Sequence, residues 1–282
     1  MTGFPQLTKH TITMEISDIK KQLRSYREWG GYKQGQDNSS YDFEIRNGSQ
    51  ILYYFAGNHS TDPKDSQFDR LENLFKKFKN ESKGQKTAIV SEQNFDPGKV
   101  INKEQAIRDF AGEMGYSLYI AKQNNLQVFQ FEPKEKQIVA ELLTEFSKDD
   151  IFYYLFARWI YWWNRGGKKP DFAAKASEVS QDLKQSLGWE SFDFSLEYFK
   201  KLHLNFFKSE LDHEDLDFFA TITKPSYTNT VFNLVCREES QIRDAHVVSG
   251  ILGLWEEGCS LFVVYGVGHA FVQKPALQKL LS

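Results

Sequence analysis

The stretch CSLFVVYGVGHAFVQKPALQKLL, residues 259–281, joins the end of an apolar run to a polar turn. Leu261 to Tyr265 have the pattern of a buried strand, which stops at Gly266, and His269 follows three residues later. Glycine at a strand end lets other groups approach the backbone closely. The stretch therefore predicts either a turn that happens to contain a histidine or one half of a site whose other half lies elsewhere in the chain.

A second apolar run ends in the same way. In ILYYFAGNHSTDP, residues 51–63, a strand-like run passes into small residues, and His59 lies three places after Ala56. Ligands of parallel sheets bind beyond the carboxyl ends of the strands. Two such histidines can converge although they lie more than 200 positions apart. A single strand-end histidine, by contrast, is typical of a structural role.

Strand-like and helical segments alternate around these two runs. Residues 41–56 contain two β-rich runs around Asn47-Gly48, a pair that favours a tight hairpin turn. Helical spacing is present at 66–80, with Ser66 as the expected N-cap, and again at 103–125 and 243–258, while 86–93 and 126–133 are strand-like. The alternation predicts an α/β fold: a central, mainly parallel sheet flanked by helices, with an N-terminal hairpin.

The middle of the chain has a different texture. Residues 134–220 are helical and aromatic, which predicts a helical insertion in a single α/β domain of residues 1–282, with core segments 41–133 and 225–282. The segment 151–163 allows three interpretations: a buried helix, a wall that lines a substrate site, or a homodimer surface. Its rings belong to Tyr153, Tyr154, Trp159, Tyr161, Trp162 and Trp163.

Composition narrows the class of protein. The formal net charge of −3 and the pI near 6.1 give no basic field, so no nucleic-acid partner is expected. The longest apolar stretch, 151–163, is too short for a membrane span and contains Arg158. Two cysteines make no disulfide framework, and the N-terminus has no signal-peptide pattern. These features predict a cytoplasmic protein without a membrane partner.

Charged residues mark the other element ends. Glu92 and Glu132 close two strand-like runs, Glu113 lies at a glycine-flanked helix start, and Arg243-Asp244 open the late helix. Imidazoles with carboxylates can ligate a divalent metal or share acid–base work, and an arginine can hold a developing oxyanion. Taken singly, each of these residues is equally typical of a solvated strand end or a helix cap.

These residues resemble a known superfamily, which joins the TraB, PrgY and GumN proteins, the Tiki proteases, the erythromycin esterases and the ChaN haem-binding proteins. Its members share two G-x-x-H motifs at strand ends, a glutamate that ends the strand after the first motif, and an arginine upstream of the second. Gly266-Val267-Gly268-His269 is similar to the late motif, Glu92 to the glutamate and Arg243 to the arginine. The resemblance covers roughly 50–133 and 225–282.

The early motif departs from the family pattern. It reads Ala56-Gly57-Asn58-His59, with alanine where the family has glycine. If the turn requires a positive φ at position 56, alanine would strain it by about 1 kcal/mol or more.

The resemblance implies a metal-dependent hydrolase that cleaves a peptide or an ester bond in a peptide or small-molecule substrate. In that interpretation His59 and His269 ligate a divalent metal (Mn, Co, Fe or Zn) or position water, Glu92 is the general base or a ligand, and Arg243 stabilises the oxyanion. Glu113 and Asp62 are further catalytic candidates. The alternative is a protein that binds haem, a metal or a small ligand through the same histidines without turnover.

Overall fold

The computed structural model describes residues 14–30, 40–92, 97–166 and 169–282. The remaining parts of the predicted 1–282 domain lie outside the described residues. The chain divides into two compact units. The first, here called the sheet unit, comprises Met1–Arg24, Gln34–Glu132 and Asp244–Ser282, and the second, the helical unit, comprises Ser25–Lys33 and Pro133–Arg243.

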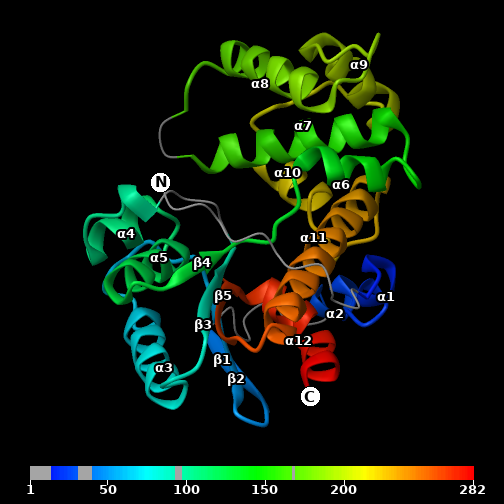
Figure 1. The fold of residues 1–282 in the computed structure, drawn as a ribbon. Helices are drawn as coiled ribbons and strands as arrows, with labels where there is room; N and C mark the ends of the chain where they lie inside the picture. The colour runs from blue at the N-terminus through cyan, green and yellow to red at the C-terminus, as the bar shows by residue number, and fades with distance from the viewer. Residues whose placement is uncertain (1–13, 31–39, 93–96, 167–168) are drawn as a thin grey trace. The chain divides into compact units, whose positions relative to one another are not determined.

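The sheet unit contains a five-stranded sheet in the order β1-β2-β5-β3-β4 (Figure 1). The strands are β1 (Tyr41–Asn47), β2 (Gln50–Gly57), β3 (Thr87–Ser91), β4 (Gln127–Phe129) and β5 (Ser260–Gly266). β1 is antiparallel to β2, and the other three neighbouring pairs are parallel. The predicted fold class, a mainly parallel sheet with an N-terminal hairpin, is confirmed.

Both faces of the central strands are buried, which explains their uninterrupted apolar sequence. Successive residues of β2 point to opposite faces, so Tyr54 belongs to one hydrophobic cluster and Tyr53 to another. The Tyr54 face packs on the second half of α11 (Val231–Glu256) and on α12 (Val267–Leu281). The Tyr53 face packs on α3 (Gln67–Glu81) and α5 (Glu113–Asn124) (Figure 1).

Local turn chemistry differs in detail from the sequence pattern. In the hairpin, Asn47 pairs with Gln50, and Gly48 alone of the expected Asn-Gly pair takes a positive φ, of 57°. The expected cap Ser66 makes no side-chain hydrogen bond to α3. Asp65 takes that role, because its Oδ1 accepts from the Gln67 amide at 2.9 Å. Ser66 is therefore the N-cap residue by position, as expected, but Asp65 supplies the side-chain hydrogen bond.

The predicted helix over 103–125 is two helices, α4 (Lys103–Asp109) and α5. Ala111 and Gly112 between them have φ values of 56° and 68°, a left-handed backbone that ends α4 and redirects the chain. Two short helices, α1 (Ile16–Lys20) and α2 (Tyr26–Gly30), precede β1 in the chain. A 3₁₀ turn, η1 (Pro97–Lys99), precedes α4.

The helical unit has its own aromatic core. It contains α2, the first part of α11, and the helices α6 (Glu135–Leu142), α7 (Lys148–Arg165), α8 (Phe172–Leu187), α9 (Leu196–Phe207) and α10 (Leu216–Ile222). The predicted helical insertion, residues 134–220, lies within the Pro133–Arg243 segment of the helical unit. Tyr153 of α7 stacks on Phe199 of α9 at 4.6 Å and is fully buried, whereas Trp162 is 58% exposed.

No helix within the described ranges combines the length and the apolar character that a membrane span requires.

Candidate functional site

The two histidine turns meet at one edge of the sheet. β2 and β5 are parallel neighbours, and Gly57 and Gly266 are register partners. His59 follows Gly57 by two residues, and His269 lies in the first turn of α12, directly after β5. Because both strands end at the same edge, the side chains that follow them come together there.

His59 is paired with a buried carboxylate. Its Nδ1 lies 2.7 Å from Oε1 of Glu113, the first residue of α5, which is fully buried although half of the His59 side chain is exposed. The hydrogen bond to Glu113 raises the pKa of His59, against the opposing effect of burial. The backbone of His59 has a φ of 57°, in the left-handed region that residues other than glycine uncommonly adopt. The structure around the site holds His59 in this conformation.

Glycine at position 57 makes room for this pair. A Cβ on Gly57 would lie 2.3 Å from Cγ and Cδ of Glu113 and 2.5 Å from its Oε1, closer than any tolerated contact. Glu113 therefore packs against bare backbone at the end of β2. Ala56 lies within β2 opposite Tyr265 and does not have a positive φ. The alanine of the early motif is thus unstrained, and the positive φ of this turn falls on His59.

His269 has a buried carboxylate of its own. Its Nδ1 lies 2.7 Å from Oδ1 of Asp244, which is fully buried in α11. The same oxygen accepts a 2.7 Å hydrogen bond from Nε2 of Gln273, one turn further along α12. The hydroxyl of Tyr54 in turn donates to Oε1 of Gln273 at 2.8 Å. This chain of hydrogen bonds fixes the orientation of the imidazole from behind.

Glu92 lies at the end of β5, beside the imidazole of His269. Its Oε2 accepts a 2.9 Å hydrogen bond from the Gly266 amide, and its Oε1 lies 3.6 Å from Nε2 of His269. A Cβ on Gly266 would lie 2.6 Å from Nε2 of His59 and 3.5 Å from Oε2 of Glu92. Gly266 therefore has both the carboxylate and the His59 ring against its backbone, and all three side chains gather around one strand end.

Four of the six predicted site residues come together here: His59, His269, Glu92 and Glu113. Asp62 does not join them; it is exposed, and its Oδ1 accepts a 3.0 Å hydrogen bond from the Lys64 amide, as in a turn. Arg243 belongs to the helical unit. There, burial raises the pKa of Glu239, but Arg158 and Arg243 outweigh it and the net shift is downward.

Sequence reasoning missed three members of the site. Asp244 stood out only as an expected helix start, Tyr54 was part of a strand-like run, and Gln273 lay in the segment that follows the last such run. One signal was present: Gln273 follows His269 by one helical turn, so the two share a face of α12. The position of Asp244 opposite that face depends on how α11 and α12 pack.

The donor set does not assemble a metal centre. Among the residues that the structure describes, no three or more His, Cys, Asp or Glu side chains are grouped so that they could hold a metal ion. The hydrolytic mechanism proposed for His59, His269 and Glu92 therefore uses no metal. The divalent metal and the haem remain predictions from the resemblance.

Comparison with known proteins finds no matching family model, no matching curated protein and no matching solved structure.

The Glu113 pair predicts the titration of His59. We expect the imidazole of His59 to titrate above the ordinary value of about 6.5, and Glu113→Gln to lower that pKa because the carboxylate acceptor is lost. The raised pKa also means that the pair stabilises the fold below the pKa of the unfolded chain and loses this contribution as pH rises through the folded pKa. Wild type should therefore exceed Glu113→Gln in free energy of unfolding by more near pH 6 than near pH 9.

Histidine Cε1–H resonances followed by NMR between pH 4 and 10 measure the pKa, and urea unfolding measures the stability difference. Glu104→Gln is the matched control, since Glu104 is an exposed helical carboxylate paired with Arg108. An unchanged His59 titration in Glu113→Gln would show that the pair does not control this imidazole.

Proposed function

We propose that the sheet unit is a hydrolase that cleaves an ester or peptide bond at the strand end around Gly266. The observation that carries the proposal is the pair of imidazoles, each held through Nδ1 by its own buried carboxylate, with Glu92 beside them. An imidazole fixed in this way presents Nε2 as its reactive atom, and the carboxylate stabilises the imidazolium that forms when Nε2 takes a proton.

His269 is assigned as the general base. With Nδ1–H donated to Asp244, its Nε2 takes a proton from water, and the resulting hydroxide attacks the substrate carbonyl. Glu92 lies next to this Nε2 and stabilises the imidazolium after the transfer. Since Asp244 is fully buried and bonded also to Gln273, the tautomer and the ring orientation are set before substrate arrives.

His59 is assigned as the general acid. Its raised pKa keeps Nε2 protonated to higher pH than an ordinary histidine, so that it can stabilise the oxyanion and then pass its proton to the leaving oxygen or nitrogen. Solvent carries the proton gained by His269 back to His59 and completes the cycle. The resemblance gives the oxyanion role to Arg243, and that role stays part of the proposal as an alternative to His59.

A second candidate function is binding without turnover. Metal-ligating histidines commonly donate their other ring nitrogen to a carboxylate, and both imidazoles here do so. In this candidate, Nε2 of His59 and Nε2 of His269 would take the metal, haem or small ligand that the resemblance implies. For both candidate functions we also propose a cytoplasmic location. The partner in either case is a small molecule or a peptide.

Hydrolysis assays with the full chain test the two candidates. We expect turnover of at least one member of a panel of nitrophenyl esters, lactones and fluorogenic peptides, in the presence of a chelator, and a loss of about 10²-fold or more in His269→Ala. The same panel is run after loading with Mn, Co, Fe or Zn, and calorimetry with each metal and with haem follows on the His59→Ala and His269→Ala variants.

Turnover that requires an added metal would replace the metal-free mechanism by the metal-dependent one. Absence of turnover in every condition, together with metal or haem binding that both alanine variants abolish, would overturn the hydrolase proposal in favour of binding.

A further inference from the structure

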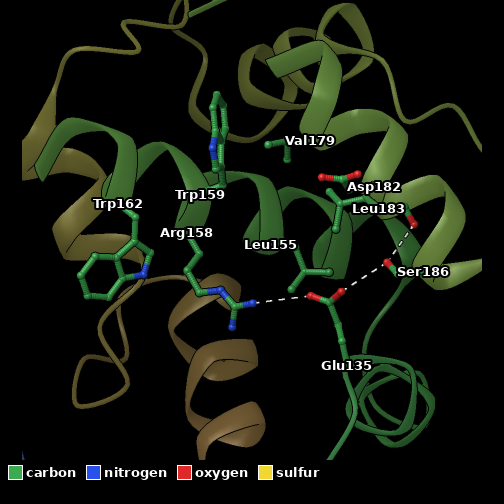
Figure 2. Close-up of a pocket in the computed structure, with 9 residues that line it drawn as sticks. All are labelled: Glu135, Leu155, Arg158, Trp159, Trp162, Val179, Asp182, Leu183 and Ser186. Atoms are coloured by element: carbon green, nitrogen blue, oxygen red, sulfur yellow. Dashed lines mark hydrogen bonds and ion pairs between the residues drawn. The ribbon is translucent and has the colours of Figure 1, made fainter. Parts of the chain in front are cut away.

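The helical unit contains a cavity of about 360 Å³ between α6, α7 and α8 (Figure 2). Its residues play no part in the site of the sheet unit. The volume lies at the lower end of the range for small-molecule sites. Its lining combines two indoles, two carboxylates and one guanidinium with aliphatic side chains, and this combination limits what the cavity can take.

The two indoles make the apolar wall. Trp159 is partly buried and stacks on Phe172 at 5.5 Å, so its position is fixed by the core of the helical unit. Trp162 is 58% exposed, although burying a large indole side chain would stabilise the fold. The guanidinium of Arg165 lies 5.2 Å from the centre of the Trp162 ring, so this indole already interacts with a cation.

The carboxylates give the cavity a negative balance. Glu135 and Asp182 both line it, and Arg158 is the cation among the lining residues that the structure describes. Arg158 is engaged, because it forms an ion pair with the buried Glu239 and lies 3.7 Å from Oε1 of Glu135. Glu135 also accepts a 3.2 Å hydrogen bond from the Ser186 hydroxyl. The carboxylates of Glu135, Asp182 and Glu239 outnumber the guanidinium groups of Arg158 and Arg165, which leaves this part of the helical unit with an excess of negative charge.

We propose that this cavity binds an organic cation, a primary amine or guanidinium group carried on a flat apolar body. Asp182 and Glu135 hold the cationic head, and the indoles of Trp159 and Trp162 supply apolar contact for the body. The carboxylates offer hydrogen-bond acceptors to an N–H head, and the ring faces attract its positive charge. A neutral ligand of the same shape gains the apolar contact and forgoes both of these attractions.

Calorimetry on the full chain with 2-phenylethylamine tests the site, with 2-phenylethanol as its neutral counterpart. We expect the amine to bind and the alcohol to bind about tenfold more weakly or not at all. Asp182→Asn and Trp162→Ala should each weaken amine binding by about 3–10-fold. Glu178→Gln is the matched control, because Glu178 is an exposed carboxylate on the same helix that pairs with Lys175, and its effect should stay within about twofold.

Two sources can supply such a cation, a free amine or a lysine side chain in a peptide. A blocked Phe-Lys dipeptide distinguishes them, since tighter binding of the dipeptide than of the amine points to a peptide ligand. Circular dichroism of each variant checks that the helical unit is folded. Equal binding of amine and alcohol, amine binding that neither Asp182→Asn nor Trp162→Ala weakens, or no binding of any probe would overturn the proposal.

Discussion

Replacing Asp244 by asparagine is expected to lower the rate of hydrolysis by about 10²–10⁴-fold. Asp244 is fully buried, and its Oδ1 holds Nδ1 of His269 and also Nε2 of Gln273. An asparagine amide in this position can donate to Nδ1, which moves the ring proton to Nε2 and removes the base. Because the shape is nearly unchanged, the variant should remain folded.

Two measurements separate this effect from a loss of structure. The kcat/KM ratio of variant to wild type gives the size of the effect, and the ¹⁵N shifts of the His269 ring report which nitrogen carries the proton. Asp109→Asn, an exposed aspartate at the end of α4, should leave both unchanged. If Asp244→Asn retained full activity with its tautomer reversed, His269 would not be the base.

The second large effect is expected from Gly57→Ala. A Cβ here would lie 2.3 Å from Cγ and Cδ of the fully buried Glu113, so the Glu113 side chain would have to move. Overpacking of this kind costs about 1–3 kcal/mol of unfolding free energy. The displaced carboxylate should also release His59, so that the pKa of His59 falls toward its ordinary value. Both changes should occur together because both follow from the movement of one side chain.

Gly268→Ala is the control for this variant. Gly268 lies in the first turn of α12, and a Cβ there would meet nothing within 4 Å. We expect its stability to stay the same or to rise by about 0.5–1 kcal/mol, since alanine favours a helix more than glycine does. Urea unfolding of both variants and NMR titration of His59 provide the comparison. Equal stability of Gly57→Ala and wild type would mean that Glu113 is not packed against the end of β2.

Much of the sheet could be predicted from local pattern. Residues 51–56 and 261–265 are apolar without interruption, which is what burial of both faces demands, and the Gly48 turn marks the hairpin. The sequence pattern did not decide between two neighbouring polar residues at the start of a helix. Ser66 and Asp65 can both cap α3, and the choice depended on the backbone that leads into the helix. The break before α5 likewise depended on left-handed residues whose sequence, Ala111-Gly112, marks only one of them.

The histidine site divides in the same way. The sequence by itself determined that His59 and His269 follow buried strands and that Glu92 ends a third, because strand ends are marked by local composition. Only the tertiary structure decided that β2 and β5 are neighbours, which brings the two imidazoles to one edge, and that Glu113 and Asp244 lie behind them. The physical reason is range. Propensity and periodicity act over a few residues, whereas strand order and the packing of α5, α11 and α12 depend on contacts between segments far apart in the chain.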